Sequence, residues 1–236
     1  MNPVDIAHVL LEALPYIRRF SDKLIVIKYG GAAMEDDALK HAFAEDVALL
    51  KFVGMHPVIV HGGGPQISAA LERAGIATEF RGGRRVTDAA TMSIVEQVLV
   101  GTINKEIVAL IAGHGRKAVG LSGKDGSLVV ARRREDVHDL GLVGEVAAVN
   151  PGVITALDGY IPVIAPTAAD ESGQTYNINA VDVAAKIAES LGAEKRVLLT
   201  DVVGNQDGAG ELIHTLTAAQ VEGHIADGTI TGGMIP

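Results

Sequence analysis

Two glycine-rich turns, each directly after an apolar run, constrain the fold of this chain more than any other feature. The first is Lys23-Leu-Ile-Val-Ile-Lys-Tyr-Gly-Gly31 and the second is Pro57-Val-Ile-Val-His-Gly-Gly-Gly-Pro65. Apolar runs of this length, rich in β-branched residues, are typical of strands buried in a parallel sheet. The carboxyl ends of parallel strands meet at one edge of the sheet, where ligands bind. The sequence therefore predicts a crevice lined by both glycine turns.

Lys28 is the candidate cation of this crevice, because it stands two residues before Gly30. A lysine near the end of a buried strand either extends to solvent at the rim or is held there for an anion. Bare N–H groups of a glycine turn, and the positive end of a helix that Pro65 can begin, suit a polyphosphate or a carboxylate. Such turns also occur for packing alone, so both explanations stay open at this point.

Apolar periodicity predicts alternating helices and strands. Helices are predicted at residues 2–20, 36–53, 66–74, 88–111, 150–157, 181–191 and 216–226, and further strands at 118–121, 128–131, 144–149, 161–165 and 196–201. Residues 79–86 are predicted to be extended, with a hairpin turn at Gly82–Gly83. This alternation is typical of an α/β fold, and we expect a three-layer αβα sandwich with a mostly parallel open central sheet.

The polar segment 166–176 is the best boundary within the chain. We expect an amino-terminal amphipathic helix at residues 1–20, an acylated-amino-acid-binding lobe at 21–170 and a nucleotide-binding lobe at 171–236. The amphipathic helix either covers its own core or packs against another subunit.

Composition excludes several classes of function. A net charge of −9 and an aromatic content of 3% argue against a nucleic-acid surface. The lack of cysteine removes disulfides, thiolate catalysis and cysteine-bound zinc. No apolar run is long enough to span a bilayer, and the amino terminus lacks the order of a signal peptide. We expect a cytoplasmic protein with no membrane partner.

Common catalytic motifs are absent. Gly120-Leu-Ser-Gly-Lys124 is too short for a P-loop and has a lysine where a nucleophile elbow needs glycine. Ile67 stands where a dinucleotide-binding motif would have its last glycine. The histidines form no H-E-x-x-H or comparable metal-ligand pair.

Seven short motifs occur in order along nearly the whole chain. They are Lys28-Tyr-Gly-Gly31, His61-Gly-Gly-Gly-Pro-Gln66, Arg85-Val-Thr-Asp88, Asn104-Lys-Glu106, Val119-Gly-Leu-Ser-Gly-Lys-Asp125, Asn177-Ile-Asn-Ala180 and Leu199-Thr-Asp-Val202. The ordered set resembles the acetylglutamate kinase family of the amino-acid kinase superfamily. The resemblance implies the amino-acid kinase fold and ATP-dependent phosphorylation of the side-chain carboxylate of N-acetyl-L-glutamate, which gives an acyl phosphate in arginine biosynthesis.

The resemblance also implies roles for single residues around the substrate. Lys28 would stabilise the transferring phosphoryl group, since one well-placed cation is commonly worth about 10³ in rate. Arg85 would hold the α-carboxylate of the substrate with its planar fork, and Asn177 would bind the substrate through its amide. Gly63 and Gly64 would lie against the acetylated substrate, where a side chain would obstruct its approach.

ATP and Mg²⁺ are the implied cofactors. The backbones of Gly30, Gly31 and Gly62 would offer donors to the phosphates. The nucleotide would lie along Asp201, Val202, Val203, Gly204, Asn205 and Gln206. Mg²⁺ would be held largely by the oxygens of ATP, so no protein metal ligand is predicted.

The chain departs from the family at two places. The family has an aspartate, which orients the catalytic lysines, directly after the alanine that matches Ala180; here Val181 follows and Asp182 comes one place later. On a helix this shift rotates the side chain by roughly 100°. Either the local backbone compensates and Asp182 is catalytic, or the carboxylate leaves the site. The family also continues beyond the stretch that matches Gly233–Pro236 with a second catalytic lysine, so we expect the carboxyl-terminal part of the fold to be missing.

Partners and alternatives follow from the same resemblance. The amino-terminal helix resembles the extension of arginine-inhibited hexameric members, which implies a homodimer or a hexamer of dimers. A kinase of N-acetylaminoadipate or of carrier-linked glutamate is the nearest alternative, because one methylene discriminates by only ~1–3 kcal/mol. A catalytically impaired binding protein of the same fold is the alternative from another class.

Overall fold

A five-stranded parallel sheet forms the centre of the protein. The structure, a computed structural model, describes residues 2–135, 139–200, 204, 206–207 and 211–229. The strand order is β11-β1-β2-β8-β5, and all four pairings are parallel. The strands are β1 (Leu24–Tyr29), β2 (His56–His61), β5 (Ala118–Ser122), β8 (Ile161–Ala165) and β11 (Lys195–Leu198).

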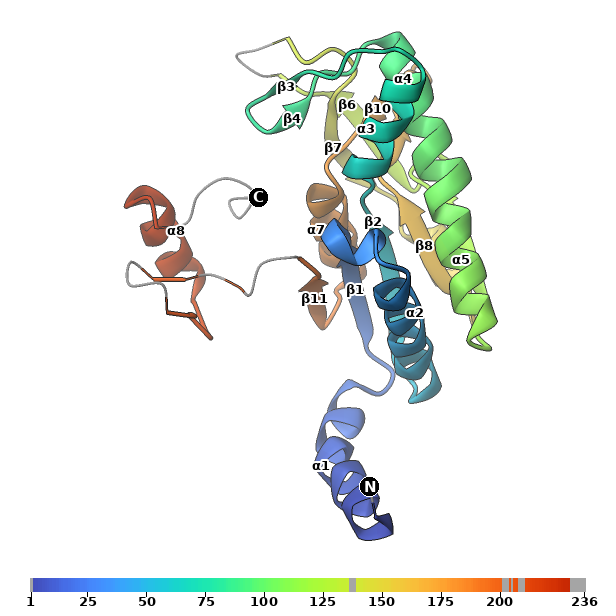
Figure 1. Cartoon of the computed structure of the whole chain (residues 1–236), viewed down its shortest axis with the longest axis vertical. Helices are drawn as coiled ribbons and strands as arrows, with labels where there is room; N and C mark the ends of the chain where they lie inside the picture. The colour runs from blue at the N-terminus through green and yellow to red at the C-terminus, as the bar shows by residue number, and fades with distance from the viewer. Residues whose placement is uncertain (1, 136–138, 201–203, 205, 208–210, 230–236) are drawn as a thin grey trace.

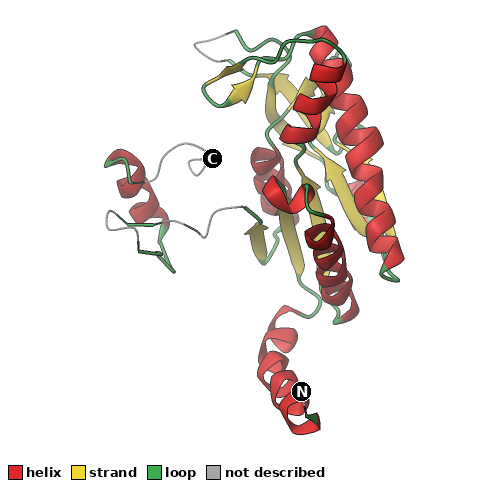
Figure 2. Cartoon of the chain, in the orientation of Figure 1, coloured by secondary structure: helices red, strands yellow, loops and turns green. Residues whose placement is uncertain are grey.

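Side chains that alternate along these strands build two separate cores. In β1, Ile25 and Ile27 belong to one buried cluster, whereas Val26 between them belongs to the other. The first cluster is covered by α2 (Asp37–Phe52), α3 (Gly64–Arg73), α4 (Ala89–Glu96) and α5 (Asn104–Gly113). The second is covered by α6 (Gly152–Thr155), α7 (Ala180–Leu191) and a smaller sheet. The predicted αβα layering around a mostly parallel sheet is confirmed, as Figure 2 shows.

The smaller sheet was not predicted. It has the order β10-β9-β6-β7, with β6 (Val129–Arg133), β7 (Gly144–Val149), β9 (Thr167–Ala169) and β10 (Thr175–Asn177). Strand β6 pairs antiparallel with β7 and parallel with β9, and β9 pairs antiparallel with β10. The expected boundary at 166–176 therefore falls within the β9–β10 hairpin, and the division into lobes stays a prediction.

The helix predicted over residues 88–111 forms as three consecutive pieces. Asp88 caps α4, since its side chain accepts a hydrogen bond from the Thr91 N–H. A π-helical segment, η2 (Gln97–Ile103), then joins α4 to α5. Such π-helical turns are frequent at functional sites. Here η2 lies beside the second glycine turn.

A short hairpin follows α3, as predicted. Strands β3 (Phe80–Arg81) and β4 (Arg84–Arg85) pair antiparallel, with Phe80 opposite Arg85. Gly82 and Gly83 join them at φ 55° and 74°, the left-handed region that a two-residue type I′ turn requires. This hairpin carries three arginines, Arg81, Arg84 and Arg85. The short 3₁₀ helices η1 (Gly31–Met34) and η3 (Asp125–Ser127) follow β1 and β5.

Helix α1 (Pro3–Phe20) extends away from the layered body (Figure 1). Its amino end is closed by a capping box between Asn2 and Asp5, and Phe20 is its one buried residue. Helix α8 (Ala218–Ala226) also begins with a capping box, between Thr217 and Gln220. Over the described ranges, none of the helices has the length and apolar character needed to cross a membrane.

Candidate active site

A cavity of about 290 Å³ opens where β1 and β2 end in their glycine turns. The cavity brings together residues from both turns, from the β3–β4 hairpin, from β10 and from the start of α7. Seven of the predicted site residues line it: Lys28, Gly30, Gly62, Gly63, Gly64, Arg85 and Asn177. The crevice expected from the two strand ends therefore exists at the sheet edge where parallel folds bind ligands.

Lys28 lies against the first glycine turn. It is the fifth residue of β1, and its Nζ is 2.8 Å from the point that a Cβ on Gly30 would occupy. The lack of a side chain at Gly30 therefore leaves the space in which the ammonium lies. The structure places Gly31 at the start of η1, directly after β1 and Gly30.

The second glycine turn begins α3 at the cavity wall. Gly63 is the cap of α3, and no side chain bonds to its first N–H groups. Uncapped N–H groups and the helix dipole attract anions. Gly62, predicted as a donor to phosphate, instead donates its N–H to the Tyr29 carbonyl oxygen at 2.8 Å. The donors of this turn are therefore those of α3.

Gly63 and Gly64 differ in what surrounds them. A Cβ on Gly63 would collide with Ile103 Cδ1 and would lie 2.8 Å from Leu99 Cδ2, both on η2. A Cβ on Gly64 would meet nothing within 4 Å. The predicted reason for glycine, free approach of a ligand, fits Gly64. At Gly63 the close packing of η2 supplies a different reason.

His61 and Asn104 hold the second turn from inside the core. Both are fully buried, and Asn104 Nδ2 lies 3.2 Å from His61 Nε2 and 2.9 Å from the Val163 carbonyl oxygen. His61 Nδ1 lies 2.9 Å from the Gly62 carbonyl oxygen, which can only accept, so Nδ1 carries the proton and Nε2 accepts from Asn104. Burial lowers the pKa of His61 to about 4. The imidazole is therefore neutral at pH 7.

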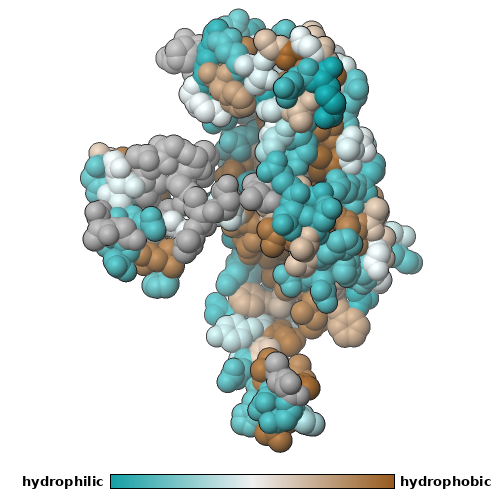
Figure 3. Space-filling view, in the orientation of Figure 1, coloured by the Kyte–Doolittle hydropathy of each residue, from teal (hydrophilic) through white to brown (hydrophobic). Residues whose placement is uncertain are grey.

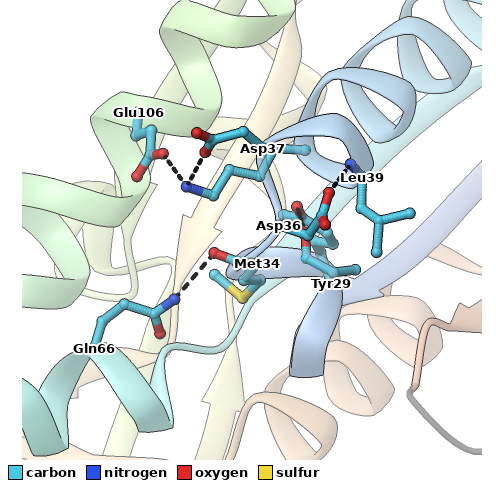
Figure 4. A network of polar contacts seen from close by, with 9 residues as sticks. Tyr29, Met34, Asp36, Asp37, Leu39, Gln66 and Glu106 are labelled. Carbon is cyan, nitrogen blue, oxygen red and sulfur yellow. Dashed lines mark hydrogen bonds and ion pairs between the residues drawn. The ribbon is translucent and has the colours of Figure 1, made fainter.

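A polar network supports the first turn (Figure 4). The Lys40 ammonium bridges Asp37 at 3.1 Å and Glu106 of α5 at 2.9 Å. Gln66 Nε2 donates to the Met34 carbonyl oxygen at 3.2 Å, which ties η1 to α3. The Tyr29 hydroxyl closes η1 by donating to a carbonyl oxygen four residues on, at 2.6 Å.

Arg85 is a buried cation at the cavity wall. Its side chain is held by Thr78 and Ser68 hydroxyls at 3.3 and 2.8 Å and by the Gly64 carbonyl oxygen at 3.1 Å. The guanidinium also lies 4.7 Å from the centre of the Phe80 ring. Only 7% of the residue is exposed, and burial lowers its pKa from the ordinary value. Among the described residues no carboxylate pairs with it, and the groups that contact the guanidinium are neutral.

Asn177 and the start of α7 form the opposite wall. Asn177 ends β10, and its Nδ2 donates to Thr87 Oγ1 at 3.3 Å. Two residues on, Asn179 caps α7 by accepting from the Val181 N–H at 2.9 Å. Asn179, Ala180 and Val181 all line the cavity. A second helix amino terminus therefore faces the same space.

Residues 23–236 match the sequence model of the amino acid kinase family. The acetylglutamate kinase of Chromobacterium violaceum is 56% identical over 239 residues, which cover 98% of this chain and 82% of the relative. That of Geotalea uraniireducens is 54% identical over 245 residues, covering 99% of this chain and 84% of the relative. The chain belongs to the acetylglutamate kinases of the amino acid kinase family. A solved structure from Streptococcus mutans UA159 is 31% identical, has a TM-score of 0.81 and covers 90% of this chain and 86% of its own.

Within this acetylglutamate kinase fold, Asp182 lies outside the cavity lining. Its carboxylate is 3.8 Å from the Arg84 guanidinium, while Val181 occupies the lining position before it. The one-residue shift thus brings an apolar side chain to the cavity and pairs the carboxylate with the hairpin. A catalytic role for Asp182 stays a prediction.

The nucleotide residues predicted from the acetylglutamate kinase resemblance fall into two groups. Gly204 and Gln206 are described but do not line the cavity; a Cβ on Gly204 would lie 2.8 Å from Leu212 Cδ1. Asp201, Val202, Val203 and Asn205 lie outside the described residues. In the described part of the chain no group of three or more His, Asp or Glu could hold a metal ion.

Several residues that line the cavity were not predicted from the sequence. Among them are Arg84 beside Arg85, Leu99 of η2 and the start of α7. Asn179 followed by an apolar helical run could have indicated the cap of α7. No local pattern in the sequence indicated which side of the hairpin faces the cavity or where η2 lies.

Proposed function

We propose that the cavity is where this kinase binds N-acetyl-L-glutamate and receives the phosphoryl group of ATP. The reaction is the ATP-dependent phosphorylation of the side-chain carboxylate, in arginine biosynthesis. Arg85 carries the proposal. It is a buried cation whose partners among the described residues are neutral, in the wall of a cavity near the size of a small metabolite. A buried charge is costly unless it is paired, so an anionic ligand supplies the missing partner.

The two ends of the substrate match the two sides of the cavity. The α-carboxylate pairs with Arg85, because a guanidinium binds a carboxylate through two parallel hydrogen bonds. The side-chain carboxylate then extends toward Lys28 and the amino end of α3. Asn177 contacts the acetamido group between them. This order puts the reacting oxygen at the strand ends.

The phosphoryl step follows from this placement. A carboxylate oxygen forms a bond to the γ-phosphorus while the bond between that phosphorus and the ADP oxygen breaks, giving an acyl phosphate and ADP. Lys28 and the uncapped N–H groups of α3 stabilise the negative charge on the transferring oxygens. Both are in place before the reaction, so the chain's own contribution is positioning and charge stabilisation.

We propose that Mg²⁺ is held by the phosphates of ATP. The described residues contain no cluster of carboxylates and histidines for it, which fits the preference of Mg²⁺ for substrate phosphates over an all-protein cage. When bound, the ion neutralises phosphate charge. A cytoplasmic location fits the use of ATP.

We propose that α1 mediates self-association. Its exposed apolar residues are Val4, Ile6, Val9, Leu10, Leu11, Leu14 and Tyr16, with Leu11 65% and Tyr16 67% exposed. Apolar areas are visible on the surface of α1, at the bottom of Figure 3. A helix that extends from the body with such a surface matches a contact with a second copy of the chain. A Leu10→Glu plus Leu14→Glu variant should reduce the mass measured by light scattering.

Trapping of the acyl phosphate tests the proposed reaction. The chain is incubated with Mg·ATP and N-acetyl-L-glutamate in hydroxylamine, and the hydroxamate is measured. The hydroxamate should form with N-acetylglutamate and form more slowly with N-acetylaminoadipate. The Arg85→Ala variant should form much less of it than the unaltered chain. Arg81→Ala is the matched control, since Arg81 is on the same hairpin but exposed and bonded to Glu79 at 2.7 Å. Equal loss in both arginine variants would reject the assignment of Arg85.

A further inference from the structure

Thr87 lies where three segments that line the cavity meet. It is fully buried two residues beyond β4. Its N–H donates to the Leu140 carbonyl oxygen at 3.0 Å, and its carbonyl oxygen accepts from the Leu142 N–H at 2.6 Å. Gly141, which forms a bridge with Thr87, has φ +68°, and a Cβ there would collide with the Thr87 carbonyl oxygen. The backbone around Thr87 is therefore closely packed.

The hydroxyl of Thr87 joins the two proposed substrate-binding residues. Oγ1 donates to the Arg85 carbonyl oxygen at 2.9 Å, and it lies 3.3 Å from Asn177 Nδ2. A carbonyl oxygen can only accept, so the single hydroxyl proton is used on Arg85. Toward Asn177 the hydroxyl can then only accept, which requires the NH₂ end of the amide on that side.

This hydrogen bond also fixes where the other polar atom of the Asn177 side-chain amide lies. With Nδ2 bound to Thr87, Oδ1 is the amide atom of Asn177 that is left for a ligand. No donor among the described residues bonds to this oxygen. The cavity wall therefore offers an acceptor at Asn177, beside the donors of Arg85 and Lys28 elsewhere in the lining.

We infer that Thr87 is a positioning residue that turns Asn177 Oδ1 toward the ligand, so that the site selects an acylated amine by its N–H. The inference rests on the proposed function. At neutral pH, N-acetylglutamate has two carboxylates and one amide carbonyl, all acceptors, and a single donor, the amide N–H. Only this N–H complements Oδ1. Turned the other way, Asn177 would present a donor, which opposes the N–H of an amide and matches the oxygen of an ester.

An ester analogue tests this inference directly. In 2-acetoxyglutarate of matching configuration, an oxygen replaces the N–H, which sets two acceptors against each other. Calorimetric titration of the unaltered chain should give an affinity about 10- to 100-fold lower for the ester than for N-acetylglutamate, the cost of one unmatched buried acceptor.

Three variants separate orientation from simple packing. Thr87→Val has nearly the same shape but no hydroxyl, so the ratio between amide and ester affinities should fall toward unity. Thr87→Ser retains the hydroxyl and should keep the ratio. Asn177→Ala removes the acceptor and should also lose it. Thermal melts by circular dichroism accompany each titration, and the unaltered chain, Thr87→Ser and Asn177→Ala decide the question if Thr87→Val does not fold.

Several results would overturn the inference. One is an unchanged ratio of amide to ester affinity in Thr87→Val. The others are a ratio that falls to unity in Thr87→Ser, or a ratio that stays as in the unaltered chain in Asn177→Ala. Equal binding of amide and ester by the unaltered chain would overturn it while leaving the proposed function standing. Failure of the folded, unaltered chain to bind either compound would reject both.

Discussion

The two glycine turns look alike in the sequence but are held by different physical constraints. At Gly30 an added Cβ would meet the end of the Lys28 side chain at 2.8 Å, which is flexible and can move. At Gly63 it would collide with Ile103, a buried residue of η2. The first turn leaves space for the Lys28 ammonium, whereas the second leaves space for the packing of η2.

This difference separates rate from stability. Changes at the first turn act on the position of Lys28, and so, in the proposed reaction, on the transition state. Changes at the second turn act on packing and on the buried His61 below it, and so on the free energy of unfolding. Substitutions at the two turns and in the networks that support them test this division.

Lys28→Met should lower kcat by about 10³, because the side chain keeps its length but loses the charge that stabilises the transferring phosphoryl group. Affinity for N-acetylglutamate, measured by calorimetry, should stay within a few-fold because Arg85 and Asn177 are unchanged. A melting temperature close to that of the unaltered chain would show an intact fold. A loss of affinity as large as the loss of kcat would contradict the assignment of Lys28 to the transition state.

His61 should make the protein less stable in mild acid. Its pKa is about 4 in the folded protein and 6.5 ordinarily, so between these values the unfolded chain binds the extra proton. The free energy of unfolding therefore keeps its full value above pH 6.5 and decreases by about 3 kcal/mol as the pH falls to 4. Urea unfolding at pH 7 and pH 4 measures it. His61→Gln should flatten this change, whereas His8→Gln, on the exposed α1, should not. The lowered pKa values of Asp88, Asp139, Asp170 and Asp227, ordinarily 3.8, and of Glu189, ordinarily 4.5, remove stability at the acid end of this window in both the unaltered chain and the His61→Gln variant.

Gly63→Ala should lower the free energy of unfolding by about 1–3 kcal/mol, because Leu99 and Ile103 must shift to admit a methyl group. Gly64→Ala is the matched control and should unfold almost unchanged, since nothing lies within 4 Å of its added Cβ. Gly30→Ala should show the reverse pattern, a lower kcat with little change in urea unfolding. If Gly30→Ala were the less stable variant, the two turns would not differ as described.

Glu106→Gln should have the smallest effect. It removes one partner of Lys40, whose side chain is 19% exposed, while Asp37 remains at 3.1 Å. A pair of this exposure contributes well under 1 kcal/mol, about 0.5 kcal/mol. Urea unfolding at low and high salt should show the difference shrink as salt rises. A kcat change of more than about tenfold would mean that this network acts on Lys28.

The large sheet was predictable because its strands are apolar and bounded by turn signals. The residues predicted for β8 are those observed, and helices α2 and α7 begin and end within one residue of prediction. The small sheet was missed, because β9 and β10 have three residues each and are defined by pairing with distant segments. The π-helical η2 was also missed, since apolar spacing hardly changes with one wider turn.

The candidate site was predictable where the position of a residue relative to a predicted strand already suggests its role. Lys28 at the end of a buried strand is such a case. Arg85 is not, because its role came from the family resemblance, and nothing local distinguishes it from Arg84. Thr87 had no signal at all, since its importance depends on hydrogen bonds to residues 2 and 90 positions away in the chain.

Binding of N-acetyl-L-glutamate through Arg85 is the property on which the proposed function depends. It can be measured by calorimetric titration of the unaltered chain and of Arg85→Ala with N-acetyl-L-glutamate and with N-acetylaminoadipate, with circular dichroism to establish folding. We expect binding that favours N-acetylglutamate and is lost in Arg85→Ala. Undiminished binding by a folded Arg85→Ala variant, or no binding by the folded unaltered chain, would contradict it.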